Sequence, residues 1–212
     1  IFPTLHHPAL TVSFMTNNNE QITTSSMRDV SFAVVDFETT GIDPETDRVI
    51  QVAAIVINGE GEIVESFDTV VRPENPAQYT HGAEHVHGIS VEQVAQGMPL
   101  REALERVWTI SEGNVFTAHN AKFDINFLHA ESARVGLENK IDTYVDTLAL
   151  ARRTDQDRTR KHSLHALCEH YGIDHENAHE AKSDATATAE LLIHLMREMD
   201  VQKPDQLPDL FS

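Results

Sequence analysis

Five residues whose side chains can bind metal ions or accept protons stand close to the ends of predicted strands and helices. Asp36 and Glu38 lie at the end of the apolar segment VVDFE, Asp124 ends HNAKFD, and His179 and Asp184 lie in AHEAKSD. Carboxylate oxygens are the ligands that Mg²⁺ and Mn²⁺ prefer, and an ordinary histidine pKa of ~6.5 suits a side chain that takes a proton from water. These residue types could therefore form a divalent-metal site with a proton acceptor beside it.

Asp36 and Glu38 are two residues apart in an apolar strand, so both side chains should project from the face that carries Phe32 and Val34. Neighbouring carboxylates repel each other, and burial penalises each of them further. The pair comes directly before the segment TTG, at the strand end where α/β sheets place ligand sites. The competing interpretation is a solvated strand end with two ordinary acids.

Asp124 and Asp184 each lie near the start of a predicted helix. We expect Asn120 to cap the first of these helices. An acid in a first turn can simply compensate the helix dipole, which is the simpler explanation for either residue alone. His179 precedes Asp184 by five residues, so the two side chains converge only if His179 lies in the loop before the helix. Taken alone, His179 would be an ordinary exposed loop residue.

The elements that must position these residues can be predicted from periodicity and turn signals. We expect strands over residues 30–38, 48–58 and 62–73, joined as an antiparallel meander. Short strands near 114–119 and 141–145 follow, in alternation with helices. We expect a short helix directly after Ser90. Further helices are expected over residues 100–108, 121–136, 148–153, 164–172 and 185–199. This order predicts an α/β domain with a central mixed β-sheet flanked by helices.

Composition excludes several classes of protein. The 212 residues carry a net charge of −18, which excludes a general electrostatic grip on nucleic acid. A single cysteine, Cys168, excludes an internal disulfide framework and suits a reducing compartment. The sequence has no apolar run of membrane-spanning length and no basic residue before Arg28, so we expect neither a membrane span nor a signal peptide. The expected location is cytoplasmic.

The chain divides into three predicted parts. Residues 1–28 form a disordered or tag-like lead-in with a polar linker, residues 29–200 a single domain, and residues 201–212 a tail.

The order D-x-E, H-N-x-x-F-D and H-x-x-x-x-D resembles the DEDDh family of 3'-to-5' exonucleases. The segments VVDFETTG and AHNAKFD are most similar to the branch that contains the epsilon proofreading subunit of bacterial DNA polymerase III. The resemblance covers residues 29–199 and implies a ribonuclease H-like fold. It also implies hydrolysis of single-stranded DNA from 3' ends to nucleoside 5'-monophosphates, in replication proofreading or repair.

The same resemblance implies a role for each of the five residues. Asp36 would bridge two divalent ions, Mg²⁺ or Mn²⁺. Glu38 and Asp184 would complete the site of the ion that carries the attacking water, and Asp124 would support the second ion. His179 would be the general base.

Substrate contacts follow from the resemblance as well. It places five residues around the terminal nucleotides: Thr39, Ile42, His87, Asn120 and Phe123. The only dense basic run, residues 152–162, is expected either to follow the substrate backbone or to be a solvated loop.

The tail KPDQLPDLFS resembles peptides by which bacterial polymerase and repair proteins dock on the sliding clamp. Pro204 and Pro208 would keep it extended, with Leu210 and Phe211 exposed for a partner. The alternative is that Leu210 and Phe211 fold back on their own domain.

Three other functions stay open. One is an RNA-trimming exoribonuclease of the same superfamily. Another is a non-catalytic adaptor that binds a polymerase or clamp, which would gain nothing from clustered like charges. The third is a small-molecule phosphoesterase, which the lack of a Gly-rich phosphate cradle disfavours.

Overall fold

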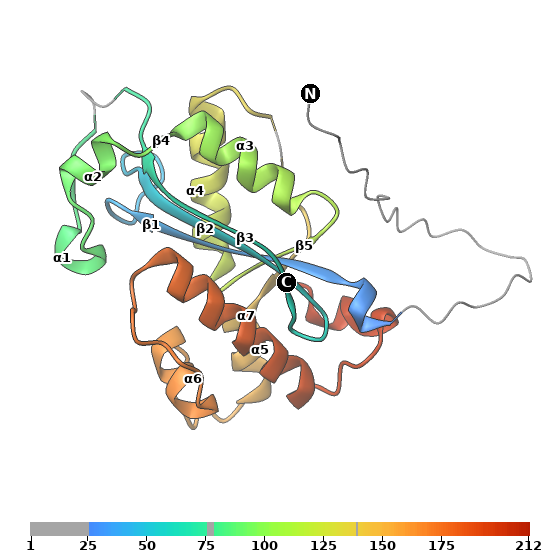
Figure 1. The fold of residues 1–212 in the computed structure, drawn as a ribbon. Helices are drawn as coiled ribbons and strands as arrows, with labels where there is room; N and C mark the ends of the chain where they lie inside the picture. The colour runs from blue at the N-terminus through green and yellow to red at the C-terminus, as the bar shows by residue number, and fades with distance from the viewer. Residues whose placement is uncertain (1–25, 76–78, 139) are drawn as a thin grey trace, which may run out of the picture.

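A six-stranded mixed sheet, with strand order β4-β3-β2-β1-β5-β6, lies between two groups of helices (Figure 1). The computed structural model describes residues 26–75, 79–138 and 140–212, so most of the predicted lead-in lies outside the described residues. The strands are β1 (Ser31–Thr39), β2 (Val49–Asn58), β3 (Ile63–Arg72), β4 (Met98–Pro99), β5 (Val115–Ala118) and β6 (Tyr144–Asp146). The helices are α1 (Glu84–His87), α2 (Val91–Ala95), α3 (Leu100–Ser111), α4 (Ala121–Arg134), α5 (Thr147–Thr154), α6 (Leu164–Tyr171) and α7 (Ala181–Glu198). The α/β class and the mixed sheet are confirmed.

The predicted antiparallel meander of β1, β2 and β3 is confirmed. β1 pairs with β2 so that Asp36 lies opposite Ala53, and β2 pairs with β3 in the same antiparallel manner. On its other side β1 pairs in parallel with β5, but only from Phe32 to Val34. The edge of β1 next to Asp36 and Glu38 is therefore free of a strand partner on that side, at the carboxyl ends of two parallel strands.

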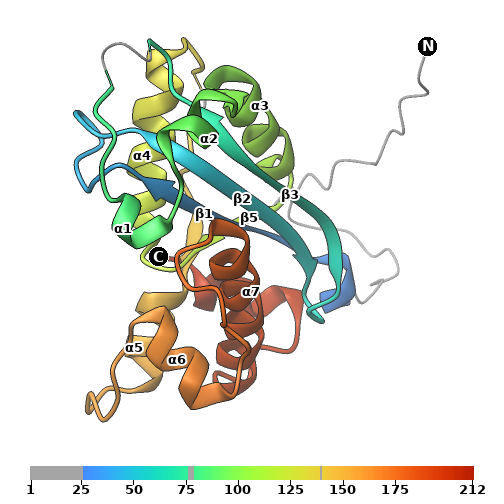
Figure 2. The ribbon, with the colours of Figure 1, turned by 60° about the vertical axis from the view of Figure 1, so that its left-hand side comes forward.

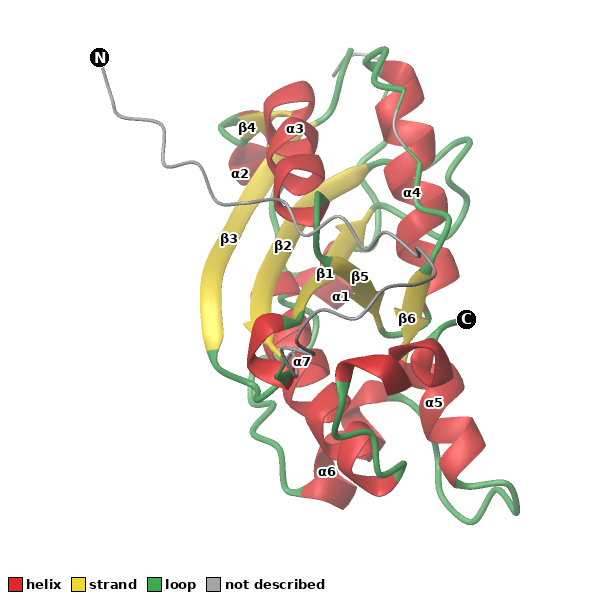
Figure 3. Cartoon of the chain, turned by 90° about the vertical axis from the view of Figure 1, so that its right-hand side faces the viewer, coloured by secondary structure: helices red, strands yellow, loops and turns green. Residues whose placement is uncertain are grey.

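Side chains of β1 alternate between two cores. Phe32 and Val34 are fully buried against α5, α6 and α7, whereas Ala33 and Val35 are buried against α3 and α4. Figure 3 shows the two helix groups on opposite faces of the sheet. Since Asp36 continues the face of Phe32 and Val34, its carboxylate points toward the side of the sheet that α7 covers, as the alternation predicts.

Helix α7 begins at Ala181, four residues earlier than predicted. Ala181 is fully buried, and its N–H donates to the side-chain oxygen of Gln51 on β2 at 3.2 Å. This contact between distant segments places Asp184 in the first turn of α7. Among the described residues, the structure contains no helix long and apolar enough to cross a bilayer.

The prediction of an extended, exposed tail was wrong. Pro204–Leu210 form a 3₁₀ helix, and Leu210 is fully buried in the core beneath α7. Phe211 forms a β-bridge with Val145, and the Ser212 N–H donates to the Tyr144 carbonyl at 3.0 Å. The tail therefore folds back on its own domain. Burial of the apolar Leu210 side chain stabilises this folded-back conformation relative to one in which Leu210 is exposed to water.

Candidate active site

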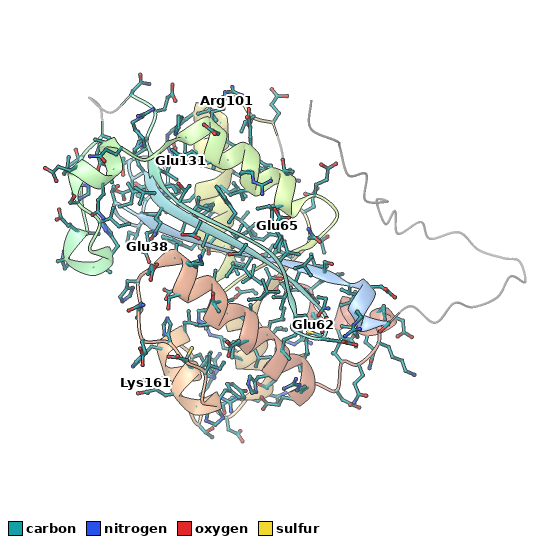
Figure 4. All side chains as sticks on the ribbon, in the orientation of Figure 1. Glu38, Glu62, Glu65, Arg101, Glu131 and Lys161 are labelled. Carbon is teal, nitrogen blue, oxygen red and sulfur yellow. The ribbon has the colours of Figure 1, made fainter. Side chains whose placement is uncertain are left out.

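All five residues singled out in the sequence line one cleft of about 690 Å³ at the end of β1. Asp36 and Glu38 come from β1, Asp124 from the first turn of α4, and Asp184 from the first turn of α7. His179 comes from the turn before α7. In Figure 4 the Glu38 label lies beside the beginning of α7. Segments more than a hundred residues apart thus converge as predicted.

Asp124 is tied directly to the backbone of β1. Its Oδ1 accepts a hydrogen bond from the Phe37 N–H at 3.2 Å, and the side chain is nearly completely buried. This N–H is on the edge of β1 that β5 leaves unpaired, so the carboxylate replaces a missing strand partner. The bond holds Asp124 beside the residue between Asp36 and Glu38.

A second buried carboxylate fixes the far half of α4. Glu131 is fully buried, accepts from the Val49 N–H at 2.9 Å and pairs with Arg134 at 3.3 Å. Arg134 also donates to the Glu45 carbonyl at 2.9 Å. Because α4 is bonded to the sheet at both ends, the position of Asp124 is set by two independent contacts.

Asn120 is the N-cap residue of α4, as predicted, but its side chain makes no capping hydrogen bond. It adopts a left-handed conformation with φ of 64°, and its N–H donates to Asp146 Oδ1 at 2.9 Å. Asp146 belongs to β6 and also caps α5 by accepting from the Leu148 N–H. The long-range bond to Asp146 therefore sets the entry into α4.

His179 lies in the loop, as convergence with Asp184 requires. It is exposed and has a left-handed backbone with φ of 68°. Ligand atoms of His179, Glu38 and Asp184 all lie within 4.8 Å of one another. This is close enough for the imidazole and the two carboxylates to share an ion or a water molecule.

The cleft concentrates negative charge that the protein itself does not neutralise. Burial, followed by the charges of Asp124, Asp184 and Glu38, raises the pKa of Asp36 well above its usual range. Burial and the charge of Asp184 raise the pKa of Glu38 to about 7. Burial also raises the pKa of Asp124 well above normal, against the bond from Phe37. A divalent cation fits this oxygen-rich, anionic donor set.

These shifts predict a pH-dependent stability. A carboxyl whose pKa is raised on folding stabilises the fold below its unfolded pKa, and this contribution is lost as pH rises through the folded pKa. For Glu38, the rise from 4.5 to about 7 corresponds to about 3 kcal/mol. In EDTA, the free energy of unfolding should therefore fall between about pH 5 and pH 8. Mn²⁺ should restore it increasingly toward high pH.

The measurement is thermal and urea unfolding across this pH range, with EDTA or millimolar Mn²⁺. Glu38→Gln is the matched control, since it removes one titrating carboxyl and should flatten the EDTA profile. Parallel EDTA and Mn²⁺ profiles would contradict the prediction.

Of the five predicted substrate contacts, Asn120 and Phe123 line the cleft. Thr39, Ile42 and His87 are not among its lining residues. Ile42 is 85% exposed, and the Thr39 hydroxyl donates to the Gly41 carbonyl at 2.6 Å.

His87 is buried in the loop that carries α1. It donates from Nε2 to the Gly82 carbonyl at 2.9 Å and accepts from the Ile89 N–H at 3.0 Å. Gly82 in turn lies close to Thr40: a Cβ added to Gly82 would be 2.4 Å from the Thr40 carbonyl oxygen. The His87 loop is therefore packed beside the end of β1, where Figure 2 shows α1.

Sequence reasoning assigned no role to His119, which precedes Asn120 and lines the cleft. Its ring lies between the Thr147 hydroxyl, 2.9 Å from Nδ1, and the His162 carbonyl, 3.1 Å from Nε2. Burial lowers the pKa of His119 to about 4, so the ring is neutral near pH 7. Only its place as the first residue of H-N-x-x-F-D could have signalled it in the sequence.

The basic run divides into two parts. Arg152 is exposed and lines the cleft together with Leu148. Arg160 instead donates to the Tyr171 hydroxyl at 3.2 Å and pairs with Glu198 at 3.5 Å. One arginine of the run therefore faces the site, and another fastens the loop to the helices behind it.

Sequence comparison relates the chain to exonucleases and to bacterial replicative polymerases. The exonuclease family model, RNase T, matches residues 33–192. The PolC-type DNA polymerase III of Thermotoga maritima is 32% identical over 190 residues, which are 88% of this chain and 14% of that protein. The PolC-type enzyme of Listeria welshimeri is 34% identical over 187 residues, 86% of this chain and 13% of that protein. The chain thus spans only a small part of these relatives.

Solved structures share the fold. Escherichia coli exonuclease I in complex with a dT13 oligonucleotide superposes with a TM-score of 0.67 at 20% identity, over 81% of this chain and 42% of that chain. The nuclease domain of 3'hExo, a DEDDh family member bound to rAMP, gives 0.68 at 18% identity, over 79% and 92%. The predicted ribonuclease H-like fold is confirmed. From the family match, the relatives and the fold, it follows that the chain belongs to the DEDDh, DnaQ-like exonuclease family and is a nuclease.

Proposed function

We propose that the chain is a metal-dependent 3'-to-5' exonuclease that removes nucleotides from single-stranded DNA ends beside a DNA polymerase. The observation that carries the proposal is the meeting of Asp36, Glu38, Asp124, Asp184 and His179 in one open cleft. A scaffold has no use for acids whose pKa values are raised by mutual repulsion and burial. Such a set is suited to cations and an anionic substrate.

Asp36 has the central position among the acids, since its carboxylate is subject to the charges of the other three. In the proposal it would hold two divalent ions, Mg²⁺ or Mn²⁺. Glu38 and Asp184 would complete the site of one ion, and Asp124 would support the other. When bound, the ions would neutralise phosphate charge and acidify the attacking water.

His179 is proposed to take the proton from that water. It is exposed, lies on a turn and reaches within 4.8 Å of the ligand atoms of Glu38 and Asp184. As the new P–O bond forms, the bond from phosphorus to the 3'-oxygen of the preceding nucleotide breaks, and this oxygen takes up a proton from solvent water. The released product is a nucleoside 5'-monophosphate, and the shortened strand keeps a 3'-hydroxyl.

Substrate binding is proposed to come from a few residues around the cleft. Phe123 is half-buried, with its ring centroid 4.8 Å from that of Phe127, so it offers a supported aromatic surface for a terminal base. Stacking of this kind tolerates any base and contributes about 1–3 kcal/mol. Arg152 is suited to a backbone phosphate, and Asn120 lies beside Phe123 in the same wall. Thr39, Ile42 and His87 would act from the end of β1, the turn that follows it and the end of α1.

The PolC relatives favour DNA and a polymerase partner. RNA is the second candidate, because structural neighbours include a nuclease domain bound to rAMP and a 3'-exonuclease that recognises a histone mRNA stem-loop.

The test is degradation of 5'-labelled single-stranded DNA and RNA of one sequence with Mn²⁺. A ladder shortening from the 3' end, with deoxynucleoside 5'-monophosphate released and RNA degraded more slowly, is the expected result. A strand blocked at its 3' end is the control. Products released from the 5' end would contradict the direction, and preference for RNA would support the second candidate.

A further inference from the structure

His175 is a buried histidine beside the cleft that neither the sequence pattern nor the family match singles out. It lies in the loop between α6 and α7, four residues before His179, and its side chain is only 5% exposed. Its Nε2 lies 2.5 Å from Asp184 Oδ1. Among the described residues, its Nδ1 is buried without a hydrogen-bond partner.

The acceptor character of a carboxylate decides which group donates this hydrogen bond. A carboxylate only accepts hydrogen bonds, so Nε2 carries the proton and donates. A hydrogen bond from an N–H to a charged oxygen is stronger than a hydrogen bond between two neutral groups. One oxygen of Asp184 is therefore held by His175, and Oδ2 remains for other ligands.

Asp184 needs such a partner because of its neighbours. Its charge acts on both Asp36 and Glu38. An unrestrained aspartate in the first turn of α7 could rotate away from these like charges and relieve the repulsion. The donor on His175 opposes that rotation and keeps the carboxylate in the cleft.

The same bond fastens the loop that carries His179. Ile173 is buried in the core on one side of the loop, and the Ala181 N–H donates to Gln51 on the other. His175 adds a third attachment, directly before the exposed turn that ends at His179.

We infer that His175 is a positioning residue: its bond to Asp184 Oδ1 holds that carboxylate for metal binding and anchors the His179 loop. The inference rests on the proposed function, because it assigns Asp184 to a metal. Partners that orient a metal ligand in this way typically change metal affinity or activity 10–100-fold when removed. In this inference His175 acts only through Asp184 and is not itself a catalytic residue.

The experiment compares His175→Leu, which keeps the approximate volume without a donor, with His175→Gln, whose amide nitrogen can replace Nε2. Metal-free protein is titrated with Mn²⁺, and the free ion is followed by electron paramagnetic resonance. We expect His175→Leu to bind Mn²⁺ about 10–100-fold more weakly and His175→Gln to stay close to wild type. Exonuclease activity of His175→Leu should recover as Mn²⁺ is raised.

His194→Leu is the matched control. His194 is a half-buried histidine on α7 that packs on Tyr171, with ring centroids 5.1 Å apart, away from the cleft. It reports the loss of a partly buried imidazole that does not contact Asp184, and its Mn²⁺ affinity should be unchanged. If His175→Leu does not fold, His175→Asn replaces it, because the shorter amide cannot reach Asp184.

Two outcomes overturn the inference alone: wild-type Mn²⁺ affinity in a folded variant without the donor, or equal weakening in His175→Gln. A wild-type protein that binds no Mn²⁺ and degrades neither DNA nor RNA would overturn the proposed function, and this inference with it.

Discussion

Asp36→Asn is expected to abolish exonuclease activity and, without metal, to make the protein more stable. Asp36 is proposed to bind both ions, so its loss removes several kcal/mol of transition-state stabilisation, a fall in turnover of at least about 10³-fold. The amide has nearly the same shape but no charge, so it removes both the cost of burying a charge and the repulsion from the neighbouring acids, which together raise the pKa of Asp36. Turnover on labelled single-stranded DNA and melting temperature in EDTA are the two measurements.

The control is Asp68→Asn, which also removes one carboxylate. Asp68 lies on β3 and pairs with Lys182 at 2.8 Å, outside the residues that line the cleft. It should keep turnover and not gain stability. An active Asp36→Asn protein would end the assignment of Asp36 as the shared ligand. A melting temperature that falls in EDTA would show that its charge is compensated in the fold.

The sequence could predict much of the acidic site because local rules predict the strands that carry or precede Asp36, Glu38 and Asp124. Alternation along β1 puts Asp36 and Glu38 on the face of Phe32 and Val34, and Phe37 between them packs in the core on the other face. The convergence of Asp124 with them follows from two parallel strands ending at the same edge of a sheet. These are consequences of spacing and chain order, which a sequence displays directly.

The contacts that hold the site in place depend on distant partners, which spacing does not reveal. Asn120 has the residue type of a side-chain cap, yet Asp146 of another strand takes its N–H and draws it into a left-handed turn. Leu210 was expected to be exposed after Pro204 and Pro208, but it is fully buried in the core beside α7. No signal in the sequence distinguishes His175 among the 13 histidines, because its contact with Asp184 exists only in the folded chain.

His179→Ala is expected to lower turnover by roughly 10²–10⁴-fold, the usual loss for a general base, with Mn²⁺ affinity changed far less. His179 is exposed, so its removal exposes no core. Its left-handed φ of 68° strains an alanine, and His179→Asn therefore serves as a second variant, because asparagine tolerates this conformation. Both variants should lose turnover alike. Single-turnover rates at saturating Mn²⁺ measure the loss.

Added imidazole separates a proton acceptor from a residue that only shapes the loop. A small base that diffuses into the open cleft can take the water's proton in His179→Ala and should restore part of the rate. The same addition should do nothing for Asp36→Asn, whose defect is in charge and metal binding. His165→Ala is the histidine control, since His165 is 67% exposed in its side chain and is not among the residues that line the cleft. If His179→Ala kept wild-type turnover, or if imidazole rescued neither His179 variant, the proton would have to leave by another route, and His179 would be reduced to a neighbour of Glu38 and Asp184.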